Sequence, residues 1–204
     1  MDTSSLIQIP GYQYNEYLLV LYPHQELRNK IIYIKNAFAD KYKTTAARFS
    51  TPQITLVNFI QFQISEERLF KKLAAIASSY HPFKVELKDF GSFPSHTIFI
   101  TVDTQLQVKN LVTELKAAQQ LMTLDKQHKA HFIDMPYIPL ARKLAPWQYE
   151  KAWLEYSNHQ FTGRFIADTM ILMKRKLEEK TYRQVQEYRF MNLPVTTKQG
   201  DLFV

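Results

Sequence analysis

The chain has 204 residues, no cysteine and only four glycines. The lack of cysteine excludes disulfides, thiolate metal sites and a cysteine nucleophile. Four isolated glycines exclude the glycine-rich loops of dinucleotide-binding and P-loop proteins and the nucleophile elbow of α/β-hydrolases. A formal net charge of +7 favours anionic partners such as nucleic acid or nucleotide phosphates, although a solvated basic surface is the simpler interpretation. The length fits a single domain, residues 1–204, that folds without a metal or disulfide.

The first third of the chain predicts two strands, each followed by a helix. Residues 17–22 are apolar on both faces, as in a buried strand. Apolar side chains spaced by three and four residues then predict a helix over 27–42. Residues 54–62 predict the second strand, and a helix over 66–76 follows with Ser65 as its N-cap.

The middle of the chain predicts a β-hairpin and another helix. Polar and apolar residues alternate over 83–88, turn residues lie at 91–95, and an apolar strand face returns over 98–102. Apolar spacing then predicts a helix over 108–122.

The last third predicts a strand over 137–141 and a helix that starts at Pro146. This helix carries an aromatic stripe that we assign to core packing: Tyr149, Trp153 and Tyr156. Two long strands over 164–174 and 182–191 complete the chain, joined by an exposed charged turn.

The sequence gives no sign of membrane insertion. Its longest apolar run, 17–23, is far shorter than the roughly 20 residues of a transmembrane helix. The N-terminus lacks the basic start of a signal peptide. We therefore expect a cytoplasmic monomer that needs no cofactor and has no membrane contact; the sequence does not identify a protein partner.

Two segments share the frame P-x-I-x-L, namely 52–56 (PQITL) and 136–140 (PYIPL). Each opens a predicted strand that precedes a helix. Because alternate residues of a strand share a face, Gln53 lies with Thr55, and Tyr137 lies with Pro139. The repeat predicts an α+β fold of two pseudo-symmetric lobes. Each lobe is an antiparallel sheet backed by helices, and the lobes face each other across a central cleft.

The sequence resembles the two-histidine (2H) phosphoesterase superfamily, which includes 2′–5′ RNA ligase-like proteins and cyclic nucleotide phosphodiesterases. The resemblance covers nearly the whole chain: the strand 17–21, PQITLVNF at 52–59, FGSFPSHTIF at 90–99, MPYIPLAR at 135–142 and the helix around Trp153. It implies the bilobal fold and, as the family activity, RNA ligation or 2′,3′-cyclic phosphodiester hydrolysis.

The chain departs from the family at its signature, which is one His-x-Thr/Ser motif in each lobe. The resemblance implies that the two histidines exchange protons around a cyclic phosphate while the hydroxyls hold its oxygens. Here the motifs read Gln53-Ile54-Thr55 and Tyr137-Ile138-Pro139. A glutamine amide carries no proton through a catalytic cycle, and a tyrosine hydroxyl is a poor base near neutral pH. We therefore expect a catalytically degenerate member. Pro139, which lacks an N–H, also predicts an edge strand or a bulge.

The candidate phosphate-binding residues are Gln53, Thr55, Tyr137 and Lys143. Lys143 is included because it shares strand parity with Tyr137, whereas Arg142 has the opposite parity and is expected to be a structural or surface charge. His96 lies in the hairpin near the predicted cleft, where a hydrogen-bonding role is favoured over catalysis. The six histidines show no metal-site spacing, and no metal is expected.

Three functions remain open. We favour a degenerate 2H fold that binds a nucleotide or RNA phosphate in the cleft between the lobes. One alternative is an active phosphoesterase with relocated catalytic groups. The other is a protein-interaction module whose cleft is vestigial.

Overall fold

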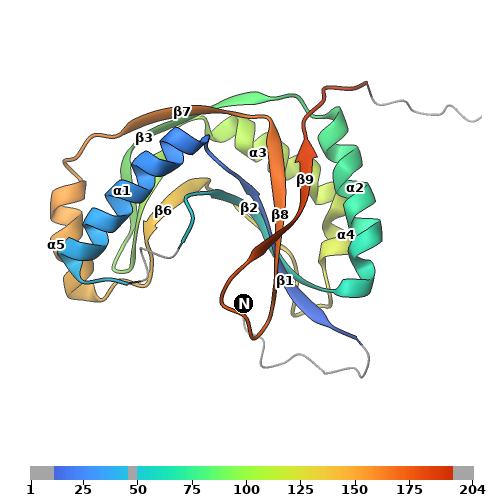
Figure 1. The fold of residues 1–204 in the computed structure, drawn as a ribbon, viewed down its shortest axis with the longest axis horizontal. Helices are drawn as coiled ribbons and strands as arrows, with labels where there is room; N and C mark the ends of the chain where they lie inside the picture. Colours follow the sequence, from blue (N-terminus) through green and yellow to red (C-terminus); the bar gives the residue numbers. More distant parts are fainter. Residues whose placement is uncertain (1–11, 46–49, 195–204) are drawn as a thin grey trace, which may run out of the picture.

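A computed structural model describes residues 12–45 and 50–194, which form two antiparallel sheets (Figure 1). The first sheet has the order β5-β2-β1-β8-β9. Its strands are β1 (Tyr14–Leu21), β2 (Ile54–Phe62), β5 (His131–Phe132), β8 (Thr169–Lys176) and β9 (Arg183–Arg189). The second sheet has the order β6-β4-β3-β7. Its strands are β3 (Phe83–Phe93), β4 (Thr97–Val102), β6 (Tyr137–Ala141) and β7 (Thr162–Ala167). The predicted α+β fold with two antiparallel sheets is confirmed.

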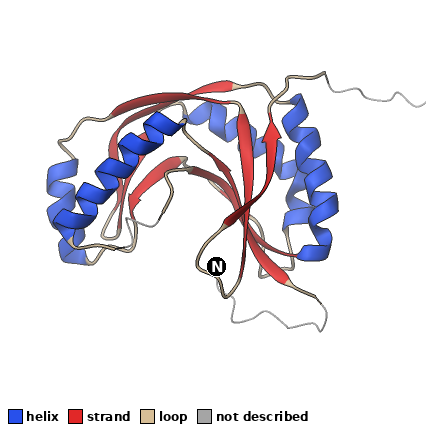
Figure 2. Ribbon diagram, in the orientation of Figure 1, coloured by secondary structure: helices blue, strands red, loops and turns tan. Residues whose placement is uncertain are grey.

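Helices back both sheets (Figure 2). Two of the helices follow a strand of one sheet but pack on the other sheet. The helices are α1 (Gln25–Tyr42), α2 (Glu66–Ser79), α3 (Gln105–Leu115), α4 (Gln119–Met122) and α5 (Pro146–Tyr156). α1 follows β1 of the first sheet but packs on β6 and β7 of the second. α3 follows β4 of the second sheet but packs on β2 of the first. The two lobes are therefore interlocked by the chain path.

One core runs through both lobes. Leu56 of the first sheet, Ile100 of the second and Leu27 of α1 belong to the same buried cluster. A second cluster joins α1 and α5 to the second sheet through Phe38, Ile98 and Tyr156. Tyr149 and Trp153 pack against this second cluster, which confirms that the aromatic stripe of α5 serves core packing.

Two expected elements near the C-terminal half differ in the structure. The expected strand over 164–174 is two strands, because the chain passes from β7 in the second sheet to β8 in the first at Asp168. The parity of the buried side chains shifts there, from Phe165 and Ala167 to Met170 and Leu172. Apolar residues also occupy positions between the buried ones, so the sequence pattern does not reveal where the alternation shifts. The expected helix over 108–122 is interrupted by a 3₁₀ turn between α3 and α4.

The hairpin turn also lies later than expected, because β3 continues to Phe93 and Gly91 pairs with Phe99 inside the sheet. A Cβ atom at Gly91 would lie 2.4 Å from Cε2 of the Phe99 ring. Glycine is therefore required here for close ring packing and not for a turn.

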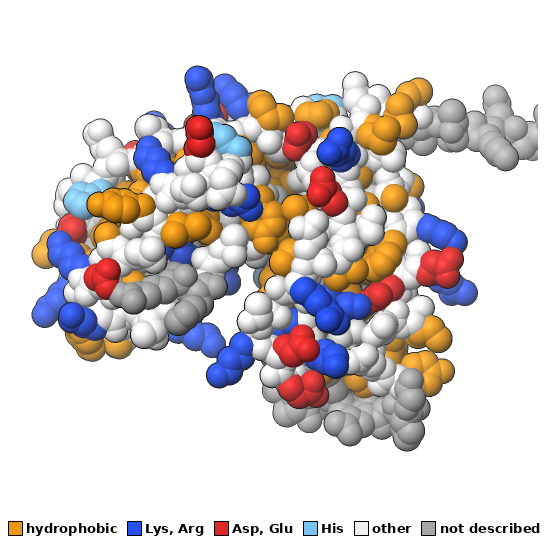
Figure 3. All heavy atoms as spheres, viewed as in Figure 1, with side chains coloured by type: hydrophobic (Ala, Val, Ile, Leu, Met, Phe, Trp, Pro, Cys, Tyr) orange, Lys and Arg blue, Asp and Glu red, His pale blue; other side chains and the backbone are white. Residues whose placement is uncertain are grey.

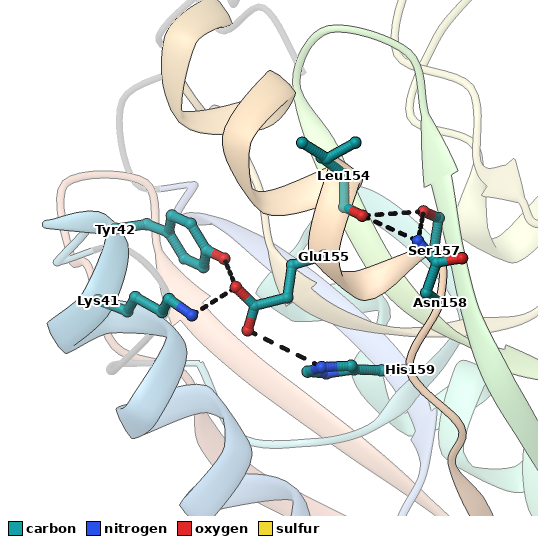
Figure 4. A network of polar contacts seen from close by, with 7 residues as sticks. All are labelled: Lys41, Tyr42, Leu154, Glu155, Ser157, Asn158 and His159. Carbon is teal, nitrogen blue, oxygen red and sulfur yellow. Dashed lines mark hydrogen bonds and ion pairs between the residues drawn. The ribbon is translucent and has the colours of Figure 1, made fainter.

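A polar cluster joins the last turn of α1 to α5 (Figure 4). Lys41 forms an ion pair with Glu155, and the Tyr42 hydroxyl donates a hydrogen bond to Glu155 Oε2 at 2.7 Å. His159 Nε2 lies 3.9 Å from the other carboxylate oxygen. The hydrogen bonds from Lys41 and Tyr42 lower the pKa of Glu155. The ionised carboxylate of Glu155 thus links α5 to α1, which packs on the second sheet.

We expect Glu155→Gln to lower the free energy of unfolding by about 1 kcal/mol at pH 7, since charged hydrogen bonds and a partly exposed ion pair are lost. The folded-state pKa of Glu155 is depressed, so its contribution is present above the usual carboxyl range and is lost as the pH falls through the folded pKa. Urea unfolding at pH 7 and at about pH 3 should therefore show a difference that shrinks in acid. Glu150→Gln, on the exposed side of α5, is the control. An equal loss at both pH values would contradict this role.

Candidate functional site

The two P-x-I-x-L segments lie where the lobes meet, because β2 of the first sheet contacts β6 of the second. Gln53 and Thr55, at the start of β2, and Tyr137, at the start of β6, are all half-buried. The expectation that these two strands approach one another is thus met. Their side chains are reachable from solvent, as a binding site requires.

Thr55 lies on the face of the first sheet that the helices leave uncovered. The opposite face carries Tyr17, whose hydroxyl donates a hydrogen bond to Glu66 of α2. Val20 is three residues after Tyr17 on β1, so its side chain lies on the face opposite to that of Tyr17. Val20 pairs with Thr55 on one neighbouring strand and with Ile171 on the other. The side chains next to Thr55 on this face are therefore apolar: Val20 is fully buried and Ile171 is half-buried.

β6 is one of the two edge strands of the second sheet and is bulged at its end. Pro139 pairs with Phe99 but Ala141 pairs with Ile98, so that Leu140 is an extra residue. Pro139 predicted an edge strand or a bulge, since a proline cannot donate a hydrogen bond to a neighbouring strand, and β6 has both features.

Tyr137 stands in an aromatic cluster with a cation above it. Its ring centroid lies 5.2 Å from that of Phe93 and 4.9 Å from that of Phe99. The Arg142 guanidinium lies 5.5 Å from the ring centroid, and its Nη2 donates a 3.4 Å hydrogen bond to the Tyr137 hydroxyl. Tyr137 thus presents a flat ring and a hydroxyl next to a positive charge.

Arg142 is an exposed charge, as expected, but it contacts Tyr137 despite their opposite parity, and the bulge explains this contact. The extra residue Leu140 shifts the alternation, so strand parity counted from Tyr137 does not extend past Pro139. Lys143 is exposed and lies beyond β6 in a left-handed backbone conformation with φ of 55°. The parity argument for Lys143 therefore has no basis, and its role in binding remains a prediction from its charge and position.

His96 has the hydrogen-bonding role that the sequence favoured. Its Nδ1 lies 2.6 Å from the hydroxyl oxygen of Thr97, and its ring lies 6.5 Å from that of Phe93. The side chain is exposed at the hairpin tip, at the edge of the aromatic cluster that holds Tyr137.

A buried lysine next to both motifs escaped the sequence analysis. Lys35 of α1 is 1% exposed, and its Nζ lies 2.6 Å from Ser50 Oγ and 3.1 Å from the Pro139 carbonyl oxygen. Burial, with the positive charge of Arg142 as the smaller cause, lowers the pKa of Lys35 to about 8. The sequence does contain a sign of this burial. Lys35 is four residues after Ile31 and three before Phe38, so it lies on the apolar side of the predicted helix.

Arg175 is a charged group on the uncovered face of the first sheet, and an ion pair with Glu16 neutralises it. Arg175 Nε donates a 2.8 Å hydrogen bond to Glu16, and the Tyr182 ring lies 4.6 Å from the guanidinium. Asn58 donates a 3.4 Å hydrogen bond to the same carboxylate. These contacts join β1, β2 and β8 on this face of the first sheet.

Seen from the side of Figure 3, the surface is indented between the lobes, and Lys and Arg side chains gather on both sides of the indentation. Within residues 12–45 and 50–194, no group of three or more His, Asp or Glu side chains is placed to hold a metal ion. No helix in this part of the chain is long and apolar enough to cross a membrane.

The sequence profile of the 2'-5' RNA ligase superfamily matches residues 22–179. The chain belongs to this superfamily. No curated protein sequence matches the chain.

Solved structures with the same fold share little sequence with this chain. Escherichia coli LigT in complex with 3'-AMP superimposes with a TM-score of 0.63 and 14% identity, covering 88% of this chain and 98% of LigT. The LigT complex with NADP+ superimposes with a TM-score of 0.59 and 16% identity, covering 88% of this chain and 99% of LigT. TT0787 of Thermus thermophilus superimposes with a TM-score of 0.60 and 17% identity, covering 86% of this chain and 98% of TT0787. At these identities the likeness establishes the fold.

Proposed function

We propose that this protein binds a nucleotide or RNA phosphate in the cleft between its lobes and does not carry out the proton-transfer reaction of the 2H phosphoesterases. The main support is the contact between β2 and β6, the strands at which the two motif positions lie, neither of which holds a histidine. Thr55 and Tyr137 retain hydroxyl groups that bind phosphate oxygens, and Gln53 offers an amide donor.

The cations at the second motif supply the charge for an anionic ligand. Arg142 is held over Tyr137, and Lys143 follows it on the exposed side of the chain. A guanidinium stacked on an aromatic ring pairs with phosphate and leaves the ring edge free for a base or ribose. LigT has been crystallised with 3'-AMP, NADP+ and ATP, which makes nucleotides the natural class to test.

The binding test uses fluorescence anisotropy with a short single-stranded RNA that ends in a 3′-phosphate. We expect affinity to fall with rising salt, as the release of counterions requires. Arg142→Ala should weaken binding and reduce the salt slope by about 1, since one phosphate contact is lost. Lys109→Ala, on α3 behind the first sheet, removes an exposed cation away from the cleft and is the control.

The outcome separates the three open functions. The same RNA with a 3′-hydroxyl should bind more weakly if the terminal phosphate occupies the cleft. Equal effects of Arg142→Ala and Lys109→Ala would show non-specific attraction to a basic surface. No binding at millimolar RNA would favour the interaction module. Steady cleavage of a 2′,3′-cyclic nucleotide would favour relocated catalytic groups.

A further inference from the structure

Ser50 and Lys35 meet at the entrance to β2 in an arrangement that binding of a phosphate does not need. Ser50 is exposed three residues before Gln53, whereas Lys35 is buried beneath it on α1. Their Oγ and Nζ atoms are 2.6 Å apart. Among the described residues, Lys35 has no hydrogen bond to a carboxylate; its second acceptor is the Pro139 carbonyl oxygen at 3.1 Å. A buried lysine without an acidic partner is costly as a cation and comparatively cheap as a neutral amine.

We propose that Ser50 and Lys35 form a nucleophile–base pair that attacks acyl esters. A nucleophilic hydroxyl requires a base within hydrogen-bond reach, and the base in turn requires a third group to orient it. The neutral amine of Lys35 donates one N–H to the Pro139 carbonyl, which aims its lone pair at the Ser50 hydroxyl. The degenerate second motif thereby orients the base through its backbone instead of supplying a histidine.

The surroundings favour the neutral form of Lys35. Burial removes the ammonium from water, and Arg142 is the charged group that further disfavours it, so that the pKa of Lys35 falls to about 8. Ser50 from the segment before β2 and Pro139 from β6 are its polar neighbours, and both are uncharged. A substantial fraction of Lys35 is therefore able to accept a proton in mildly alkaline solution.

The single base decides between acyl and phosphoryl transfer. In displacement at phosphorus the leaving oxygen departs opposite the nucleophile, so a second acid is needed on the far side. At a carbonyl carbon one base serves both steps, since nucleophile and leaving group occupy the same tetrahedral centre. The proposed activity therefore stands apart from the nucleotide binding proposed above, and either can fail without the other.

The steps balance without any further reagent. Lys35 takes the hydroxyl proton as Ser50 Oγ bonds to the carbonyl carbon, and the resulting ammonium gives that proton to the departing alcohol. An acyl-Ser50 ester remains. Water then attacks this ester while Lys35 accepts one of its protons. The acid is released, and the proton returns from Lys35 to Ser50.

The test is covalent labelling by a fluorophosphonate, with the adduct located by peptide mass spectrometry. Ser50 Oγ bonds to phosphorus, fluoride leaves, and the proton passes to Lys35, so no acid is required for the leaving group. We expect Ser50 to be labelled at least about 10²-fold faster than Ser92 in the same molecule, as general-base catalysis allows. Ser92 is the matched control because its hydroxyl lies 2.9 Å from that of Tyr149 and has no lysine partner within the described part of the chain.

Two variants complete the design. Lys35→Arg keeps the positive charge but cannot act as a base, so labelling of Ser50 should fall to the rate of Ser92. In the unmodified protein the rate should rise with pH and level off above about 8, where Lys35 is neutral. Ser50→Ala should abolish both the adduct and the hydrolysis of p-nitrophenyl acetate attributable to the pair. Equal labelling of Ser50 and Ser92 overturns the proposal even if Lys35→Arg fails to fold, as does a rate unchanged by a folded Lys35→Arg.

Discussion

Cleavage of a 2′,3′-cyclic nucleotide is expected to rise at least about 10²-fold when Gln53→His, Tyr137→His and Pro139→Thr are combined. The unmodified protein should not exceed a buffer blank by more than about one order of magnitude, because neither motif carries a proton-transfer group. β2 and β6 contact each other, so we expect the restored histidines to face the same cleft. The assay compares the folded triple variant with the unmodified protein at near-neutral pH, where histidine exists in both protonation states.

The control for this restoration carries Phe in place of the second histidine: Gln53→His, Tyr137→Phe and Pro139→Thr. It keeps the altered backbone of β6 but lacks one of the two proton carriers, so its activity should stay near the baseline. Pro139→Thr is the critical step, since the bulge at Leu140 sets the direction of the strand. A misplacement of about 1 Å can cost about 10²-fold. If the triple variant folds but equals this control, the cleft no longer has the family geometry.

The largest loss of stability is expected at Glu66, at the first turn of α2. Its Oε1 accepts hydrogen bonds from the Tyr17 hydroxyl at 2.7 Å and from Lys174 Nζ at 2.5 Å. The side chains of Lys174 and Glu66 are only 9% and 17% exposed. Glu66→Ala leaves the ammonium buried without a partner, which costs about 3–5 kcal/mol. Urea unfolding at neutral pH measures this loss.

Two comparisons test whether the loss comes from the unpaired charge. Glu67→Ala, at the next position, removes an exposed ion pair with Lys71 and should change stability by less than about 1 kcal/mol. Adding Lys174→Met to Glu66→Ala removes the stranded ammonium and should recover part of the loss. If the double variant is as unstable as the sum of the single variants, the ion pair is not the cause.

The fold and the motif strands could be read from the sequence because their signals are local. β2 and β6 begin and end within a residue of the expected 54–62 and 137–141. The repeated P-x-I-x-L frame marked where both strands open, and Pro139 indicated the edge of a sheet, where β6 lies. Strand period and proline chemistry act within a few residues, so no tertiary information was needed.

The remaining features depend on contacts between distant segments. Helical periodicity shows that α1 buries one side, but not that this side packs on the second sheet. Strand parity did not predict the contact of Arg142 with Tyr137, since the bulge at Leu140 depends on the register against β4. The Ser50–Lys35 pair joins residues that no motif connects. β5 has only two residues, which is too short for a periodic signal.

β1 lies between β2 and β8 in the first sheet, so both neighbours must be synthesised before both of its edges are paired. β2 leaves the ribosome soon after β1 and can pair with it at once, but β8 lies in the last fifth of the chain. At about 5–20 residues per second, the other edge of β1 stays unpaired for on the order of ten seconds. An open strand edge is a template for wrong pairing. We therefore expect the nascent chain to depend on chaperone protection until β8 has been translated.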